Sequence, residues 1–208
     1  MINKERRRTK AISSDLDLGR KGEILVYNLF VTLLDQDRFE IIDLNEVKET
    51  FKCFDLIVYD REDDFIYLYE VETKRKKHFE GAVRGNEIHL SDDEFKPITT
   101  YTDLSIANKD FRSIKDLDFT IEGLFKNRKL TDQEIKQCTF IMVNEADVDD
   151  LIPKTYIKVN VAKSVLKYYD DNAKYGNKRI KYRSTSRGND KLIHIPFKEC
   201  EFINDNTN

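Results

Sequence analysis

The chain has few of the residues that mark disordered, fibrous or disulfide-stapled proteins. Its 208 residues include seven glycines, three prolines and three cysteines, and 39% of them are hydrophobic. This much apolar content with so little glycine and proline excludes a fibrous or low-complexity chain and predicts one well-buried core. The cysteines, Cys53, Cys138 and Cys200, are widely spaced and match no zinc pattern, which favours reduced packing residues in a cytoplasm.

Several signatures of common protein classes are also missing. No apolar run reaches the length of a membrane span, and the first ten residues, MINKERRRTK, lack the apolar segment of a secretory signal. The three histidines form no HExxH spacing. The absence of GxxxxGK[ST] and GxSxG sets aside a P-loop nucleotide hydrolase and a nucleophile elbow. A cytoplasmic protein is expected, and a bias towards Asn, Lys, Ile and Asp indicates an AT-rich source such as a phage, acting in the host cytoplasm.

Charge is abundant but nearly balanced. The 36 Lys and Arg residues against 39 Asp and Glu residues give a net charge of −3, which counts against a strong nonspecific nucleic-acid binder. The distribution matters more than the sum. Cations gather at residues 4–10, 74–77 and 174–187, and each cluster taken alone fits a solvated surface. The second cluster differs because it directly follows a set of acidic residues.

Residues 51–74, FKCFDLIVYDREDDFIYLYEVETK, predict two strands joined by the polar turn DREDD. The second strand alternates, so Glu70, Glu72 and Lys74 share one face. A hairpin places Asp55, near the start of the first strand, beside the Glu72 end. Two carboxylates and an ammonium group therefore meet at one point.

This meeting point suits a divalent cation. Mg²⁺ and similar hard cations take oxygen ligands, usually one or two protein carboxylates with positions left for water and phosphate. Asp55 and Glu72 supply such ligands, and Lys74 can orient the attacking water or neutralise charge in a phosphorane-like transition state. Glu70 is either a supporting residue or simply exposed. The plain alternative is that all of them are ordinary charges on the solvated face of a strand, since the chain is 36% charged.

A helix is expected ahead of these strands, over residues 16–34. Its apolar positions recur at helical spacing at 25, 26, 29, 30, 33 and 34. Asp15 is the expected N-cap, and Gly22 leaves room for another backbone to approach. Glu23 lies near the core-facing edge of this helix, although an ordinary first-turn acid that complements the helix dipole fits equally well. FEIIDL, residues 39–44, predicts a strand between this helix and the hairpin.

These elements together resemble the PD-(D/E)XK nuclease superfamily, in its restriction-endonuclease-like and Holliday-junction-resolvase-like forms. The resemblance covers residues 16–74, and no glutamine-plus-tyrosine motif of the exonuclease-like branch follows it. Its matching positions are Arg20-Lys21-Gly22-Glu23 on the helix, Asp55 on the first hairpin strand and Glu72-Thr73-Lys74 on the second, with Phe54 where the name-giving proline would stand.

The resemblance implies an α/β fold with a mixed central sheet flanked by helices and an insertion at residues 91–135. It implies a metal-dependent endonuclease that hydrolyses DNA phosphodiester bonds, with selectivity for junctions or branched DNA first and restriction-type cleavage close behind. The implied ligands of Mg²⁺ or Mn²⁺ are Asp55, Glu72 and the main-chain oxygen of Thr73. Glu23 would complete or support the metal site, and Lys74 would position the water.

DNA is the expected partner. The cations assigned to grip it are Arg75, Lys76 and Lys77 after the motif, and Arg6, Arg7 and Arg8 in the arm. Residues 1–13 are expected to form that arm, basic and mobile, residues 14–203 a single domain, and residues 204–208 a polar tail. Symmetric duplex cleavage would favour a homodimer, but no interface is evident. The competing hypothesis is a nucleic-acid-binding or structural module that keeps the fold without turnover.

Weaker patterns follow Lys74. Strands are expected at residues 86–90, 138–143, 156–161 and 191–197, the last of these closing the fold and the second having the apolar character of a central parallel strand. A short helix is expected from Thr131, capped through Glu134. A helix over residues 104–117, which competes with a strand at 101–107, a helix at 161–169 and a flexible loop at 183–190 complete the prediction.

Overall fold

The protein is described from a computed structural model. The described residues are 7–47, 54–85, 87–91, 121–126, 128–131, 133–134, 137, 139–160, 180–185, 188–196 and 200–204. The helices expected at 104–117 and 161–169, together with Arg6, Cys53 and Cys138, lie outside them. Within the described ranges, no helix has the length and apolar character needed to cross a membrane.

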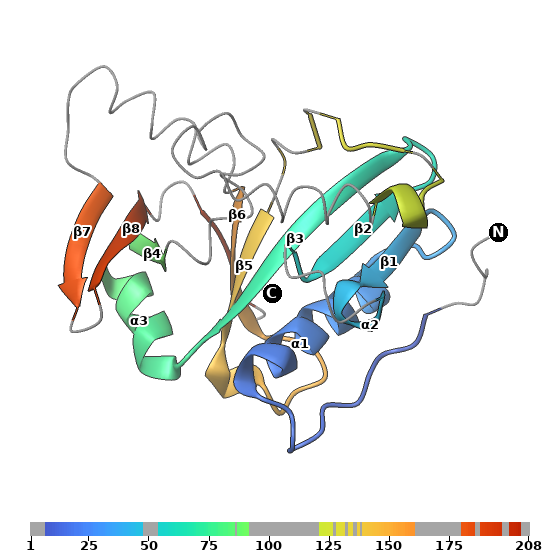
Figure 1. Cartoon of the computed structure of the whole chain (residues 1–208). Coiled ribbons are helices and arrows are strands. Elements are labelled where there is room, and N and C mark those ends of the chain that lie inside the picture. Colours follow the sequence, from blue (N-terminus) through green and yellow to red (C-terminus); the bar gives the residue numbers. More distant parts are fainter. Residues whose placement is uncertain are drawn as a thin grey trace.

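A six-stranded mixed sheet forms the centre of the molecule, in the order β1-β2-β3-β5-β6-β9 (Figure 1). All neighbours in it are antiparallel except β3 and β5, which run parallel. The predicted α/β class with a mixed sheet is confirmed, as is the parallel central strand. The strands are β1 (Phe39–Asp43), β2 (Leu56–Asp60), β3 (Phe65–Lys74), β5 (Thr139–Asn144), β6 (Thr155–Asn160) and β9 (Glu201–Asn204).

The predicted hairpin is present as β2 and β3. Leu56 pairs with Tyr69 at one end and Asp60 with Phe65 at the other, so the polar turn lies where the sequence indicates. The strand alternation also holds, because Ile66 and Leu68 pack into one core cluster while Val71 packs into another. These two clusters occupy the two faces of the sheet.

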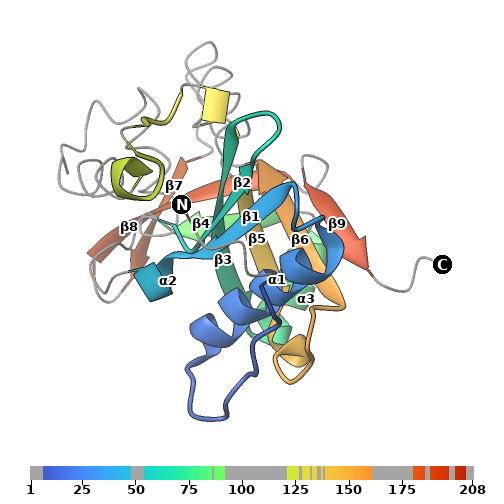
Figure 2. The same ribbon diagram turned by 90° about the vertical axis from the view of Figure 1, so that its right-hand side faces the viewer.

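Helix α1 (Leu18–Leu33) covers one face of the sheet, as the two views of Figures 1 and 2 show. Its apolar stripe supplies Leu25 and Val26, both completely buried, to the cluster that contains Val71. The expected N-cap was wrong by two residues, because Asp17, and not Asp15, accepts the hydrogen bond from Arg20 N–H at 2.9 Å. Short helix α2 (Leu44–Val47) follows β1 directly.

Helix α3 (Lys76–Gly85) begins directly after β3 and leads to a second, three-stranded sheet (Figure 1). Its strands are β4 (Glu87–Ser91), β8 (Gly188–Pro196) and β7 (Ile180–Thr185), in that order. The strand expected at residues 86–90 is present as β4. The prediction of a flexible loop at 183–190 was wrong, because residues 183–185 and 188–190 belong to the paired strands β7 and β8. The strand expected to close the fold is β8, and β9 follows it.

The capping pair predicted in the segment before β5 is also present. Glu134 is fully buried, and its Oε2 accepts hydrogen bonds from Thr131 N–H at 2.7 Å and from the Thr131 hydroxyl at 3.0 Å. Its Oε1 accepts from the backbone N–H of Ile66 at 2.7 Å. The carboxylate thus caps its own turn and fixes that turn to the start of β3.

Candidate active site

Asp55 lies where the ladder between β2 and β3 ends. Its backbone N–H donates to the carbonyl of Tyr69 at 3.0 Å, and its side-chain Oδ2 accepts a hydrogen bond from Val71 N–H at 2.7 Å. The carboxylate therefore takes the position of a backbone acceptor along the edge of β3. No described residue donates a hydrogen bond to the other oxygen, Oδ1.

The end of β3 supplies the remaining predicted groups. Glu72 and Lys74 share a face, and Lys74 Nζ lies 3.3 Å from Glu72 Oε1. The backbone of Tyr69 and Val71 faces Asp55, and backbone groups two residues apart along a strand point to the same side. The main-chain oxygen of Thr73 is therefore directed to the Asp55 side of β3, as a metal ligand in this position requires.

Helix α1 approaches β3 closely at Gly22. A Cβ atom at Gly22 would lie 1.7 Å from Thr73 Oγ1 and 3.1 Å from Thr73 Cβ. The absence of a side chain at this position is thus what allows the helix to pack against the strand at this depth. The next residue is Glu23, so this contact sets where Glu23 lies relative to β3. The prediction that Gly22 admits a close approach is confirmed.

Gly22→Ala should therefore destabilise the fold. Overpacking at a close contact typically costs about 1–3 kcal/mol. This cost opposes, and should exceed, the stabilisation that replacing a helical glycine by alanine otherwise gives. Gly81→Ala in α3 is the matched control, because a Cβ there meets nothing within 4 Å. That variant should be neutral or more stable by about 0.5–1 kcal/mol. Urea unfolding of both variants measures the difference, and equal midpoints would mean that α1 does not depend on this contact.

Three other acidic residues, from separate elements, influence the ionisation of Asp55. Burial, and next the negative charge of Glu23, raise the pKa of the Asp55 carboxyl to about 8. The charges of Asp43 and Glu72 act in the same direction, whereas the hydrogen bond from Val71 opposes them. Carboxylates from α1, β1 and β3 therefore surround Asp55 closely enough to disfavour its ionised form, the situation in which a cation binds favourably.

The donor set fits a hard divalent cation. Asp55 and Glu72 offer carboxylate oxygens and Thr73 a carbonyl oxygen, the ligand types that Mg²⁺ and Mn²⁺ prefer. Among the residues that the structure describes, no group of three or more His, Cys, Asp and Glu side chains is arranged to hold a metal ion by itself. Two carboxylates with a carbonyl, water and substrate oxygens is the smaller set that Mg²⁺ commonly accepts.

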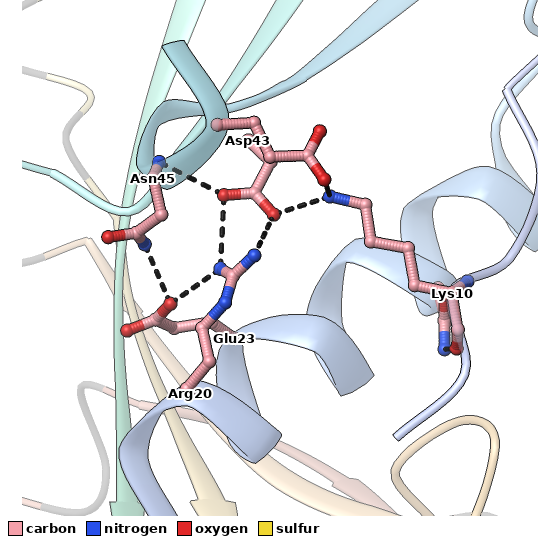
Figure 3. A network of polar contacts seen from close by, with 7 residues as sticks. Lys10, Arg20, Glu23, Asp43 and Asn45 are labelled. Carbon is pink, nitrogen blue, oxygen red and sulfur yellow. Dashed lines mark hydrogen bonds and ion pairs between the residues drawn. The ribbon is translucent and has the colours of Figure 1, made fainter. Parts of the chain in front are cut away.

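Glu23 is held by a network that the sequence did not indicate (Figure 3). Its Oε2 accepts hydrogen bonds from Arg20 Nη1 at 2.8 Å and from Asn45 Nδ2 at 2.7 Å. Arg20 also forms a two-point contact with Asp43, at 3.0 and 2.6 Å. Asp43 in turn accepts from the backbone N–H of Asn45 at 3.1 Å. A single buried carboxylate thus holds both donors to Glu23.

Lys10 adds a second cation to Asp43, with Nζ 2.5 Å from Oδ2. Burial alone would raise the pKa of Asp43, but the hydrogen bonds from Arg20 and Lys10 bring it below its usual value. The backbone N–H of Lys10 also donates to Asn28 Oδ1 at 2.7 Å, and Asn28 is completely buried in α1. The arm expected to be mobile is therefore fixed at Lys10, beside the network that holds Glu23.

The predicted DNA-gripping cations lie on the surface. Arg75, Lys76 and Lys77 are exposed at the start of α3, immediately after Lys74. Arg7 and Arg8 are exposed ahead of the Lys10 anchor. The positive charge of Arg7 opposes the burial that raises the pKa of Tyr27 in α1.

Arg20, Asp43 and Asn45 are the site residues that sequence reasoning missed. Two signals were available: Arg20 precedes Glu23 by about one helical turn, and Asp43 directly follows the apolar pair Ile41 and Ile42, where an acid is expected to have a partner. Comparisons with protein-family models, with curated proteins and with solved structures found no match.

Proposed function

We propose that the protein is a metal-dependent endonuclease that hydrolyses DNA phosphodiester bonds, on a restriction-endonuclease-like core of the PD-(D/E)XK type. The observation that carries this proposal is the convergence on Asp55. Asp55 Oδ2 accepts from Val71 N–H at 2.7 Å, and Lys74 Nζ lies 3.3 Å from Glu72 Oε1 further along the same strand. Burial, and next the negative charge of Glu23, raise the pKa of Asp55 to about 8, and the charges of Asp43 and Glu72 act in the same direction. A strongly perturbed carboxyl with specific charged neighbours is typical of a catalytic site.

In this mechanism each residue has a separate task. Asp55, Glu72 and the main-chain oxygen of Thr73 hold Mg²⁺ or Mn²⁺, which when bound neutralises charge that develops on the phosphate. Lys74 orients the attacking water for in-line displacement and takes up negative charge as it forms. The Lys74 side chain is 22% exposed and that of Glu72 is 37% exposed, so solvent partly screens their interaction. Glu23 supports the site from the α1 side.

The surface cations supply substrate affinity. Arg75, Lys76 and Lys77 lie next to the site and can bind the phosphates that flank the scissile bond. The anchor at Lys10 fixes the arm to Asp43, and Arg7 and Arg8, which precede it, can bind a strand that leaves the site. Junction-type and other branched DNA is the preferred substrate class, because the helix start at residues 20–23 most resembles the structure-selective branch.

Thermal unfolding in Mn²⁺ tests the metal site directly. A ligand at 100 times its Kd stabilises the folded state by about 2.7 kcal/mol, so the wild-type Tm should rise in Mn²⁺ and return in EDTA. Asp55→Asn should remove this response. No rise in the wild type would contradict the metal site and leave the rival function, a binding module without turnover, as the better account.

The exposed cations should act on DNA binding and not on chemistry. Each lost phosphate contact reduces the log-log salt slope by about one unit. Deleting residues 1–9, or changing Arg75, Lys76 and Lys77 to Ala, should weaken binding at moderate salt and flatten this slope. The deletion stops short of Lys10 because that residue also anchors α1.

Fluorescence anisotropy with a branched DNA in Ca²⁺ measures both slopes. For the deletion, single-turnover cleavage at saturating enzyme should remain close to wild type. The plain alternative of solvated surface charges expects no change, so slopes identical to wild type in both variants would exclude these residues from DNA binding.

A further inference from the structure

Glu23 is restrained through one of its two carboxylate oxygens. Oε2 accepts from Arg20 and Asn45, while no described residue donates a hydrogen bond to Oε1. A glutamate side chain otherwise samples several rotamers, and fixing it costs conformational entropy. Two donors from two different elements, α1 and the short helix α2, therefore hold this side chain in one orientation and leave one oxygen for another partner.

Asp43 fixes the two donors in turn. Its two-point contact sets the plane of the Arg20 guanidinium, and its Oδ1 accepts from the backbone of Asn45. The Asp43 side chain is 1% exposed, and Lys10 gives it a second cation at 2.5 Å. Stability is a weak explanation for such a site, since buried ion pairs are often replaceable by apolar residues at no cost.

We infer that Asp43, Arg20 and Asn45 are positioning residues that orient Glu23 toward the Asp55–Glu72 metal site. This inference rests on the proposed metal-dependent function. Partners of this kind, which do not touch the metal, typically change metal affinity or activity by about 10- to 100-fold when they are removed. Glu23 is the residue whose carboxylate they orient toward the metal site.

The charge of Arg20 allows positioning to be separated from simple electrostatics. Arg20→Met removes a positive charge beside a cation site, so electrostatics alone predicts tighter Mn²⁺ binding. Loss of orientation at Glu23 predicts the opposite, weaker binding. The two accounts therefore differ in sign.

Arg38 and Asp60 provide a matched control at the other end of β1 and β2. Arg38 also makes a two-point contact with an aspartate that is 1% exposed, at 3.0 and 2.6 Å, and Asp60 also accepts from a nearby backbone N–H. Asp60 lies at the far end of β2 from Asp55. Arg38→Met should lose stability as Arg20→Met does, without an effect on the metal.

Calorimetric titration with Mn²⁺ in the absence of DNA is the decisive measurement. We expect about tenfold weaker binding or more for Arg20→Met, a smaller loss for Asn45→Ala, and less than a twofold change for Arg38→Met. Asn45 is exposed, so its variant leaves no buried charge unpaired and keeps the test available if Arg20→Met does not fold. Branched-DNA binding in EDTA should be the same in all three, since none of these residues is assigned to grip DNA.

Two outcomes overturn the inference, and they are distinguishable. Wild-type protein that binds no Mn²⁺ would refute the proposed function and this inference together. Wild-type protein that binds Mn²⁺ while Arg20→Met, or Asn45→Ala in its place, binds it equally well or more tightly would refute the positioning role alone.

Discussion

Lys74→Ala should abolish DNA cleavage while the protein still folds and binds Mn²⁺. Removing a group that positions the nucleophile or stabilises transition-state charge typically costs about 10²- to 10⁴-fold in rate. Lys74 is the last residue of β3 and is partly exposed, so its truncation opens no large core cavity. Single-turnover cleavage of a branched DNA with saturating enzyme isolates the chemical step from binding.

Lys76→Ala is the matched control for this prediction. Lys76 carries the same charge two residues later but is exposed on α3, so its loss should weaken DNA binding and leave the saturated rate close to wild type. Cleavage by Lys74→Ala at the wild-type rate would contradict the assigned mechanism.

Asp55→Asn should stabilise the metal-free protein at high pH. The folded-state pKa of about 8 lies above the ordinary value of about 3.9, so the folded protein binds more protons than the unfolded chain across that window. Stability from this group is therefore present at low pH and is lost as pH rises from about 4 to about 8. The asparagine variant lacks this loss and should be more stable than wild type in EDTA at pH 8, by a few kcal/mol at most, since one pKa unit corresponds to about 1.4 kcal/mol.

Unfolding in EDTA as a function of pH measures this effect, and Asp60→Asn serves as the control. Asp60→Asn should behave oppositely and lose stability at pH 8, because the hydrogen bond from Arg38 lowers the pKa of Asp60. If Asp55→Asn were less stable than wild type at pH 8, the pKa of Asp55 would not be raised in the folded protein.

Glu70→Gln should affect metal binding less than Glu72→Gln. If Glu70→Gln alone removed Mn²⁺ binding, the metal ligand would be Glu70 and not Glu72.

Local patterns were sufficient to predict the part of the fold that builds the site. The alternation of β3 placed Glu72 and Lys74 on one face, and helical spacing placed Glu23 on α1. These features depend on neighbours within a few residues, which sequence periodicity reports directly. The position of the Thr73 carbonyl also follows from the strand, once the side of β3 that faces Asp55 is known.

The missed features depend on contacts between distant residues or on weak local signals. Asp43 and Arg20 are 23 residues apart, and only the folded chain brings them together. Helix α3 is short and mostly polar, with Phe79 as its one fully buried side chain among those described, so few apolar positions mark it as a helix. The strands β7 and β8 contain Ser, Thr, Gly and Asn, residues that are typical of loops, and pairing in a sheet overrides that preference.

The central claim is that a divalent cation at Asp55 and Glu72 supports hydrolysis of DNA, and cleavage by the wild-type protein tests it most directly. Supercoiled plasmid, a branched DNA and a single-stranded RNA would each be incubated with the protein in Mn²⁺ and in EDTA. The account predicts nicking or cutting of DNA in Mn²⁺, with branched DNA preferred, and no cutting in EDTA. Equal cleavage in EDTA, or protein that binds Mn²⁺ and DNA but cuts neither DNA substrate, would contradict it.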